Sequence, residues 1–147
     1  MTSDCIGDNS TDIEYVARSS DRSSFARLMD LKTVRADRGY ALVQVRISAE
    51  KHLNFLGKTH GAVIFALADH ACGLCGNSLG RKAVLVQSSI TFSASPEPGT
   101  VIEAEAKMIH EGKTTGTIVI DVHTSNGEPL ASCQSVVLFS NPEYSAP

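Results

Sequence analysis

The chain has 147 residues, of which 42% are hydrophobic and 20% are charged, and this is the size and composition of one globular domain. A net charge of −3 excludes the strongly basic balance of nucleic-acid-binding proteins, and no apolar run reaches the roughly 20 residues that cross a bilayer. The polar, acidic N-terminus lacks the basic-then-apolar order of a secretory signal, so we expect a cytoplasmic protein with no membrane or nucleic-acid partner.

The first residues, 1–18, contain few apolar side chains and no period, so we expect a flexible tail there. The sequence predicts one domain at residues 19–141 and a second tail at 142–147. A short helix should open the domain, capped by Ser20 or Asp21. Its expected apolar face consists of Phe25, Leu28 and Met29.

Two strands are predicted next. Residues 31–35 form a weak strand pattern, and residues 40–47 alternate clearly between apolar and polar side chains. Asp37 and Gly39 favour a tight turn between the two segments. Residues 49–58 have no period and are expected to form a loop.

The period then changes to that of a helix over residues 59–79, with Thr59 as the expected N-cap. Gly76, Asn77 and Gly80 favour its end near residue 80. This is the only long helix that the sequence predicts, and because most of its faces are apolar, other elements should surround it. Its apolar residues recur at helical spacing: Val63, Ile64, Leu67, Ala68, Ala71 and Leu74.

Four antiparallel strands are predicted to follow, at residues 84–92, 102–108, 117–123 and 131–139, with short turns between them. Asn126-Gly127 is the strongest of the hairpin signals. In the first of these strands we expect Val84, Val86, Ser88, Ile90 and Phe92 to share one face. The element order predicts an α+β fold in which a single antiparallel sheet wraps around one long central helix.

One acid, Asp69, lies on this apolar helix. An ionised carboxylate in apolar surroundings destabilises a protein unless it is paired or hydrated, and such acids are candidates for function. Two interpretations remain open: Asp69 serves chemistry, or it pairs with a neighbour or points outward.

Gly61 falls in the first turn of the helix, where backbone N–H groups have no intrahelical acceptor and the helix dipole is positive. A carbonyl oxygen could approach this N–H closely and be polarised, because Gly61 has no side chain. The alternative is that Gly61 only eases packing. Gly61 and Asp69 are eight residues apart on one helix, which is about 12 Å. If both act on one carbonyl, they must come from different subunits.

The pattern formed by Asn54, Gly57, His60-Gly61 and Leu67-Ala68-Asp69 resembles the signature of PaaI-like hotdog-fold acyl-CoA thioesterases. The resemblance covers about residues 38–139, although many relatives have a glycine where this chain has Ala62. It implies the hotdog fold, hydrolysis of aryl- or medium-chain acyl-CoA, and a homodimer with shared active sites that pairs again into a tetramer. No cofactor is implied, since CoA is part of the substrate.

The resemblance also implies roles for individual residues. The Gly61 N–H would polarise the thioester carbonyl, and the Asn54 amide would assist. The partner subunit's Asp69 would act as general base or as nucleophile, and both routes stay open. His60 would shape the site or contact the thioester. A hydroxyl that orients water would come from Ser88 or Ser89, or Gln87 would take its place.

Coenzyme A carries phosphates, so exposed basic residues are expected near the mouth of the site. The candidates are Lys58, Arg81, Lys82 and Lys113, each of which could instead be an ordinary surface charge.

Cys72-x-x-Cys75 has the spacing of a zinc or redox pair. A structural zinc site needs four ligands, and no second pair is present. The pair also lies near the helix C-terminus, where the dipole opposes a thiolate. We therefore interpret both cysteines as small buried side chains and expect no metal. His70, next to Asp69, points about 100° away around the helix and should form no dyad with it.

Two other functions remain open on the same fold. A non-catalytic acyl-CoA-binding or sensing protein would keep the pocket without turnover, and Asp69 argues against it. A hydratase acting on an enoyl-CoA would need an Asp/His pair in a different motif, which the sequence lacks.

Overall fold

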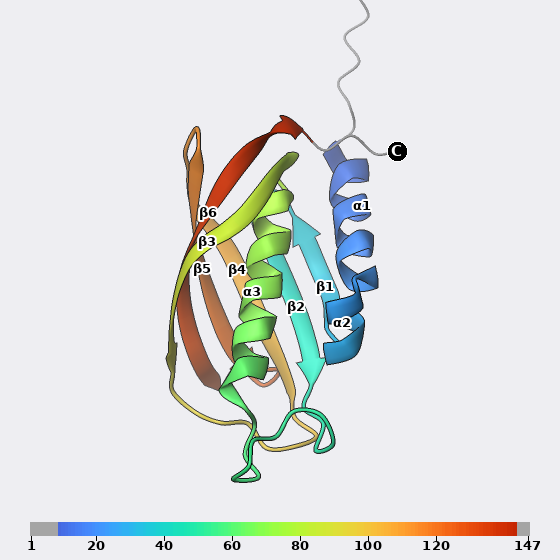
Figure 1. The fold of residues 1–147 in the computed structure, drawn as a ribbon, viewed down its shortest axis with the longest axis vertical. Helices are drawn as coiled ribbons and strands as arrows, with labels where there is room; N and C mark the ends of the chain where they lie inside the picture. The colour runs from blue at the N-terminus through green and yellow to red at the C-terminus, as the bar shows by residue number, and fades with distance from the viewer. Residues whose placement is uncertain (1–8, 144–147) are drawn as a thin grey trace, which may run out of the picture.

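The computed structural model describes residues 9–143, which form three helices and one six-stranded antiparallel sheet. The strand order is β1-β2-β4-β5-β6-β3, and the sheet curves behind the long helix α3 (Figure 1). This is the expected α+β hotdog architecture. The bounds are α1 Asn9–Arg22, α2 Ser24–Met29, β1 Lys32–Asp37, β2 Tyr40–Arg46, α3 Gly61–Asn77, β3 Arg81–Phe92, β4 Val101–Glu111, β5 Thr115–Thr124 and β6 Pro129–Glu143.

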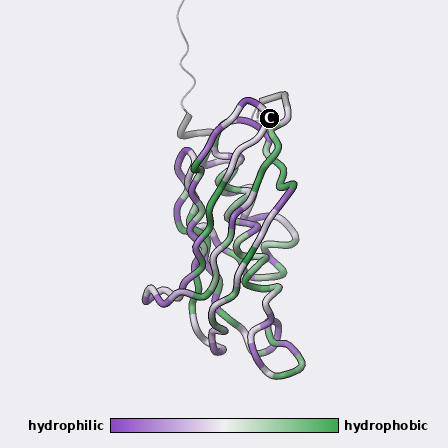
Figure 2. The backbone as a smooth tube through the Cα atoms, turned by 90° about the vertical axis from the view of Figure 1, so that its left-hand side faces the viewer, coloured by the Kyte–Doolittle hydropathy of each residue, from purple (hydrophilic) through white to green (hydrophobic). Residues whose placement is uncertain are grey.

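The core lies between α3 and the concave face of the sheet. Alternate residues of β2, β4 and β5 are buried there, as their two-residue period predicts. Figure 2 shows the backbone colour changing repeatedly between hydrophilic and hydrophobic along the strands. The strands contribute these fully buried side chains: Val43, Val45, Ile102, Ala104, Ile118, Ile120 and Val122.

Helix α3 runs along the middle of the sheet and buries Leu67, Ala68 and Ala71 completely. At its C-terminal end the Asn77 side chain donates to the carbonyls of Gly73 and Ala83 and accepts from the Ala83 N–H at 3.0 Å. These bonds fix the entry into β3. The predicted helix at residues 59–79 is confirmed, although its N-cap is His60 and not Thr59.

The N-terminal region differs from the prediction. The sequence predicts a tail up to residue 18, but α1 begins at Asn9 and packs beside α3, with Val16 in the core (Figure 1). Its composition is mostly polar because only a narrow stripe of the helix contacts the protein. The domain boundary near residue 19 stays a prediction.

The short helix α2 is also built differently from the expectation. Ser23 is its N-cap, and its side chain accepts from the Ala26 N–H at 3.3 Å. The expected apolar face is wrong, because Phe25 is 50% and Leu28 is 66% exposed while Ala26 is fully buried. Six residues make too short a helix to bury a full stripe.

Strand β3 contains a bulge between Leu85 and Gln87. The extra residue breaks the two-residue alternation. The predicted single face is therefore wrong: Val84 and Val86 are 61% and 56% exposed, whereas Ser88 and Ile90 are partly covered on the side of α3. The bulge thus turns the Ser88 hydroxyl toward the helix.

The sheet ends in β1 on one side and in β3 on the other. Helices α1 and α2 lie beside β1, while β3 has no strand beyond it (Figure 1). Strand β6 runs to Glu143, two residues past the predicted domain end. Between residues 9 and 143, none of the helices combines the length and the apolar character needed to cross a bilayer.

Candidate active site

At the N-terminal end of α3, the backbone N–H of Gly61 is a hydrogen-bond donor on a residue that has no side chain. His60 caps the helix, and its Nδ1 accepts from the Ala62 N–H at 3.0 Å. Gly61 is the first helical residue, and among the described residues its N–H has no hydrogen-bond acceptor. The dipole of α3 and this unused donor together make the position suitable for polarising a carbonyl oxygen.

The loop before α3 is shaped by Asn54. Its Oδ1 accepts from the N–H groups of Leu56 and Lys58, at 2.9 and 3.1 Å, and its backbone bonds to Lys58 and Gly57 close the turn. The Nδ2 donors of Asn54 have no partner in the described part of the chain, which leaves the amide available for a substrate. Asn54, His60 and Gly61 are therefore brought to one end of the molecule.

His52 anchors the same loop from inside. Only 1% of its surface is exposed. Its Nδ1 accepts from the Ser48 N–H at 3.0 Å, and its carbonyl accepts from the His60 N–H at 2.8 Å. Burial lowers the pKa of His52, and the Asp30 carboxylate opposes this only in part. Within residues 9–143, its Nε2 has no hydrogen-bond partner. His52 must be neutral to hold the loop, because a protonated Nδ1 cannot accept.

Asp69 lies midway along α3 on the side that the sheet leaves open. The residue is exposed, yet its apolar surroundings raise the pKa of the carboxyl, and the neighbouring His70 opposes the shift. No hydrogen bond or ion pair holds this carboxylate within the described residues. The structure therefore removes the alternative in which Asp69 is locked to a neighbouring side chain.

The two central groups of the site cannot meet in one subunit. Gly61 and Asp69 lie on the same uninterrupted helix, and eight residues at 1.5 Å each separate them by about 12 Å. A carbonyl bonded to the Gly61 N–H is therefore out of reach of Asp69 in the same chain.

Ser88 belongs to a buried polar cluster beneath α3. Its Oγ lies 2.9 Å from Ser135 Oγ and 3.1 Å from Cys133 Sγ. Burial raises the pKa of the Cys72 thiol to about 12, and the Ser135 hydroxyl beside it offsets only part of that shift. Cys72 is three residues past Asp69, so the cluster lies within a helical turn of the acid. Ser89 and Gln87 are exposed and point away from it.

The predicted CoA-binding residues fall into two groups. Lys58 belongs to the loop that Asn54 shapes, and its Nζ forms a 2.9 Å ion pair with Glu97. Arg81, Lys82 and Lys113 lie beyond the other end of α3, which is about 25 Å away. Arg81 donates to the carbonyls of Lys113 and Gly112 and stacks 3.8 Å from the Phe139 ring, so these contacts compete with any phosphate.

The remaining candidates for chemistry are buried thiols. Cys72, Cys75 and Cys133 are free and buried. Burial raises the pKa of Cys75, like that of Cys72, to about 12, so both stay protonated at neutral pH. Residues 9–143 contain no cluster of three or more His, Cys, Asp or Glu side chains that could hold a metal.

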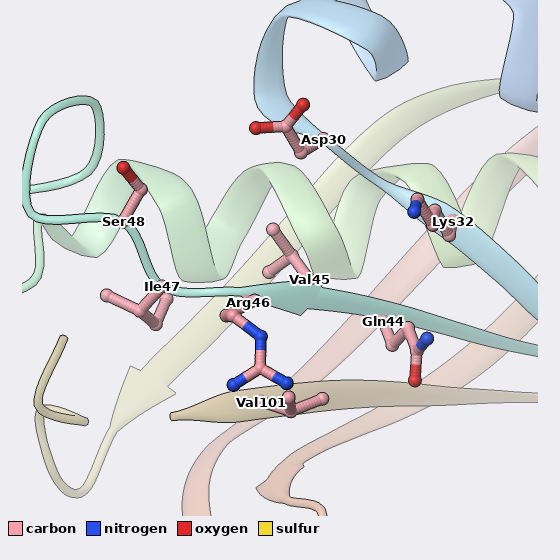
Figure 3. Close-up of a pocket in the computed structure, with 8 residues that line it drawn as sticks. All are labelled: Asp30, Lys32, Gln44, Val45, Arg46, Ile47, Ser48 and Val101. Carbon is pink, nitrogen blue, oxygen red and sulfur yellow. The ribbon is translucent and has the colours of Figure 1, made fainter. Parts of the chain in front are cut away.

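A hollow of about 620 Å³ lies elsewhere, where β1 begins opposite Gln44 and the last residues of β2 have no β1 partner (Figure 3). Figure 3 shows Gln44 and Arg46 extending away from α3. Arg46 donates to the Gly99 carbonyl at 2.7 Å, and Asp30 pairs with Lys51 at 2.7 Å. None of the predicted site residues lines this hollow.

Phe92 is a site neighbour that the sequence did not reveal. Its ring lies 3.4 Å from the position that a Cβ of Gly61 would occupy. Phe92 is the last residue of edge strand β3 and remains 48% exposed. An aromatic residue at the end of an edge strand was the available signal, but its contact with Gly61 depends on the fold. The ring forms an apolar wall beside the Gly61 N–H.

Comparison with known proteins identifies the family of this chain. The family model described as Thioesterase superfamily matches residues 56–131. A protein of Archaeoglobus fulgidus named "Putative esterase" is 33% identical over 117 residues, which are 80% of this chain and 75% of the relative. The acyl-coenzyme A thioesterase PaaI of Escherichia coli is 30% identical over 106 residues, which are 72% of this chain and 75% of that enzyme.

Solved structures agree with the fold. The Escherichia coli PaaI structure superimposes with a TM-score of 0.87 at 24% identity, covering 94% of this chain and all of that chain. A Streptococcus mutans protein solved with bound acetyl CoA gives a TM-score of 0.73 at 27% identity, covering 78% of this chain and 91% of that chain.

Proposed function

The chain belongs to the thioesterase superfamily as a PaaI-like hotdog thioester hydrolase, and from this premise we propose that it hydrolyses aryl- or medium-chain acyl-coenzyme A at sites shared by two subunits. The observation that carries the proposal is the separation of Gly61 from Asp69 by eight residues on one helix. Each group suits one half of the reaction, and only a second subunit can unite them.

The reaction would begin when the thioester oxygen accepts a hydrogen bond from the Gly61 N–H, with the Asn54 amide as a second donor. Both donors stabilise the negative charge that develops on this oxygen in the tetrahedral state. His60, as the helix cap, holds Gly61 in place. The Phe92 ring excludes water from one side of the carbonyl.

The partner subunit's Asp69 would activate the attacking water. It removes a proton while the water oxygen forms its bond to the carbonyl carbon, and it returns the proton to sulfur as the C–S bond breaks. The products are the free acid and CoA. A raised pKa makes Asp69 a stronger base, which favours this role. Alternatively, Asp69 attacks the carbonyl carbon itself, the C–S bond breaks to release CoA, and the resulting acyl-aspartyl anhydride is hydrolysed by water to the free acid and Asp69. Rapid-quench mass spectrometry separates the routes, since only the second one acylates Asp69.

Strand β3 supplies the surface for such a dimer. It is a 12-residue edge strand, and Val84 and Val86 on it are exposed. Long apolar edges are usually covered, because their free N–H and C=O groups pair with other strands. Antiparallel pairing of two β3 strands would continue the sheet across both subunits and place the two α3 helices side by side. The family resemblance further implies a tetramer.

The proposal is tested by following thiol release from a panel of acyl-CoA compounds. The wild-type protein should turn over aryl or medium-chain substrates, and Asp69→Asn should reduce kcat/KM by at least about 10³, as loss of a general base or nucleophile does. Asp121→Asn, an exposed carboxylate on β5, should leave the rate unchanged. Tight acyl-CoA binding by the wild-type protein without turnover would instead indicate a sensing protein.

A further inference from the structure

A groove of about 340 Å³ lies between α1 and α3, which is at the small end of the range for ligand sites. Helix α1 contributes Tyr15, Val16 and Ser20 to its lining, and α3 contributes His70, Gly73 and Leu74. It exists only because α1 packs against the side of α3 that the sheet does not cover.

The groove begins next to the proposed base. His70 directly follows Asp69, and Gly73 lies on the same face of α3 as Asp69, one turn further on and about 6 Å along the axis. An acyl chain that passes Asp69 in the direction of the α3 C-terminus therefore reaches the groove at Gly73.

The packing around Gly73 does not require a glycine at this position. No atom lies within 4 Å of the position that its Cβ would take, whereas a Cβ on nearby Gly76 would approach that of Ala83 to 2.9 Å. A glycine inside a helix destabilises it by about 1 kcal/mol relative to alanine. At Gly76 close packing accounts for that cost, while at Gly73 the missing side chain only keeps the groove open.

The groove suits an uncharged ligand. Val16 and Leu74 are buried apolar residues, and one wall carries the pair Ser20 Oγ and His70 Nε2 at 2.9 Å. Burial lowers the pKa of His70, so the pair is neutral at pH 7. Neither lysine nor arginine is among its described lining residues, so the phosphates of CoA have no counter-charge there.

We propose that this groove receives the acyl group of the thioester, that Gly73 sets the length it accepts, and that it selects uncharged acyl groups over those ending in a carboxylate. The inference rests on the proposed thioesterase function. The Ser20–His70 pair can donate to or accept from one polar substituent on the acyl group.

The test compares Gly73→Ala and Gly73→Leu with the wild-type protein over straight-chain acyl-CoA from acetyl to decanoyl. Gly73→Leu should lower kcat/KM for the longest substrates at least tenfold, since each methylene in an apolar pocket changes it about tenfold or more. In Gly73→Leu, turnover of acetyl-CoA should change less than about threefold. For the longest substrates, the kcat/KM of Gly73→Ala should lie between the values of the wild-type protein and of Gly73→Leu. Both variants should melt no lower than wild type, because alanine and leucine are better helix formers than glycine.

Arg18→Leu, on the exposed surface of α1, is the matched control and should keep the wild-type profile. A chain-length profile that Gly73→Leu leaves unshifted would overturn the groove assignment alone. Absence of wild-type turnover on every substrate would instead overturn the proposed function. A binding measurement does not depend on turnover: octanoyl-CoA added to Asp69→Asn should shift the NMR amide signals of Gly73 and Ser20, whereas CoA should not. Equal shifts with both would contradict the proposal.

Discussion

Gly61 and Asp69 occupy one continuous helix, the first at its N-terminus and the second midway along it. The Gly61 N–H has no acceptor and the Asp69 carboxylate no hydrogen-bonded partner within residues 9–143. About 12 Å of helix axis separates the two groups.

Replacing Asp69 with asparagine should leave the stability of the protein unchanged or increase it. The pKa of Asp69 is raised in the folded state, so the folded protein favours the protonated form. The stabilising effect of the protonated Asp69 carboxyl is present at low pH and is lost as the pH rises through the pKa of the folded state. At pH 7 the ionised group therefore opposes folding, and Asp69→Asn should melt at the same or a higher temperature while losing activity. A melting temperature several degrees lower would assign Asp69 a structural role.

The rate should depend on pH through the same group. Because Asp69 must be ionised to act, log kcat/KM should fall as the pH drops, with an inflection above about 3.9, the ordinary value for aspartate. The residual rate of Asp69→Asn should show no such inflection. An identical acid limb in this variant would show that another group controls the rate.

The role of the Gly61 N–H can be tested by removing only that proton. Proline is favoured at the first helical position, and His60 has ψ 132°, which suits a residue before proline. Gly61→Pro should therefore fold, and its kcat/KM should fall about 10²- to 10³-fold, as on loss of one oxyanion donor.

Gly61→Ala is the matched control, since it keeps the N–H and its Cβ meets the Phe92 ring at an ordinary 3.4 Å. Equal losses in the alanine and proline variants would mean that the side-chain space at Gly61 matters and its N–H does not.

His52 should make the active-site loop sensitive to acid. Its pKa is lowered in the folded state, so stability declines as the pH falls below about 6.5, where the unfolded chain takes up a proton first. His52→Asn can still accept from Ser48 but does not titrate, and should flatten this dependence. Hydrogen exchange of the Ser48 and His60 amides between pH 5 and 8 measures how the stability of this loop depends on pH. The pKa of His70 is lowered too, so His52→Asn should remove only part of the pH dependence of stability. An unchanged pH dependence in this variant would show that His52 is not its source.

Most of the fold could be predicted because its signals are local. The alternation in residues 40–47 and the helical period after residue 60 each reflect one buried face, so the strands and α3 were found. Helix α1 was missed because Val16 is its only buried apolar side chain within the described residues. The β3 bulge was missed because an inserted residue leaves no mark in composition.

The sequence singled out the candidate residues of the site but not their surroundings. Asp69 and Gly61 stood out because an acid in an apolar helix and a glycine in its first turn are locally unusual. The anchoring of the loop by His52 and the groove at Gly73 depend on contacts between distant segments, namely the 48–60 loop with α2 and α1 with α3. No pattern within either segment reveals such a contact.

Mixing two inactive variants tests the shared site most directly. A dimer of one Asp69→Asn subunit and one Gly61→Pro subunit has one site with both groups intact, supplied by opposite chains. After unfolding and refolding together in equal amounts, half of the dimers should be mixed, and about a quarter of wild-type activity should return for a two-fold symmetric dimer. Activity no higher than that of the separate variants would contradict a site built from two subunits.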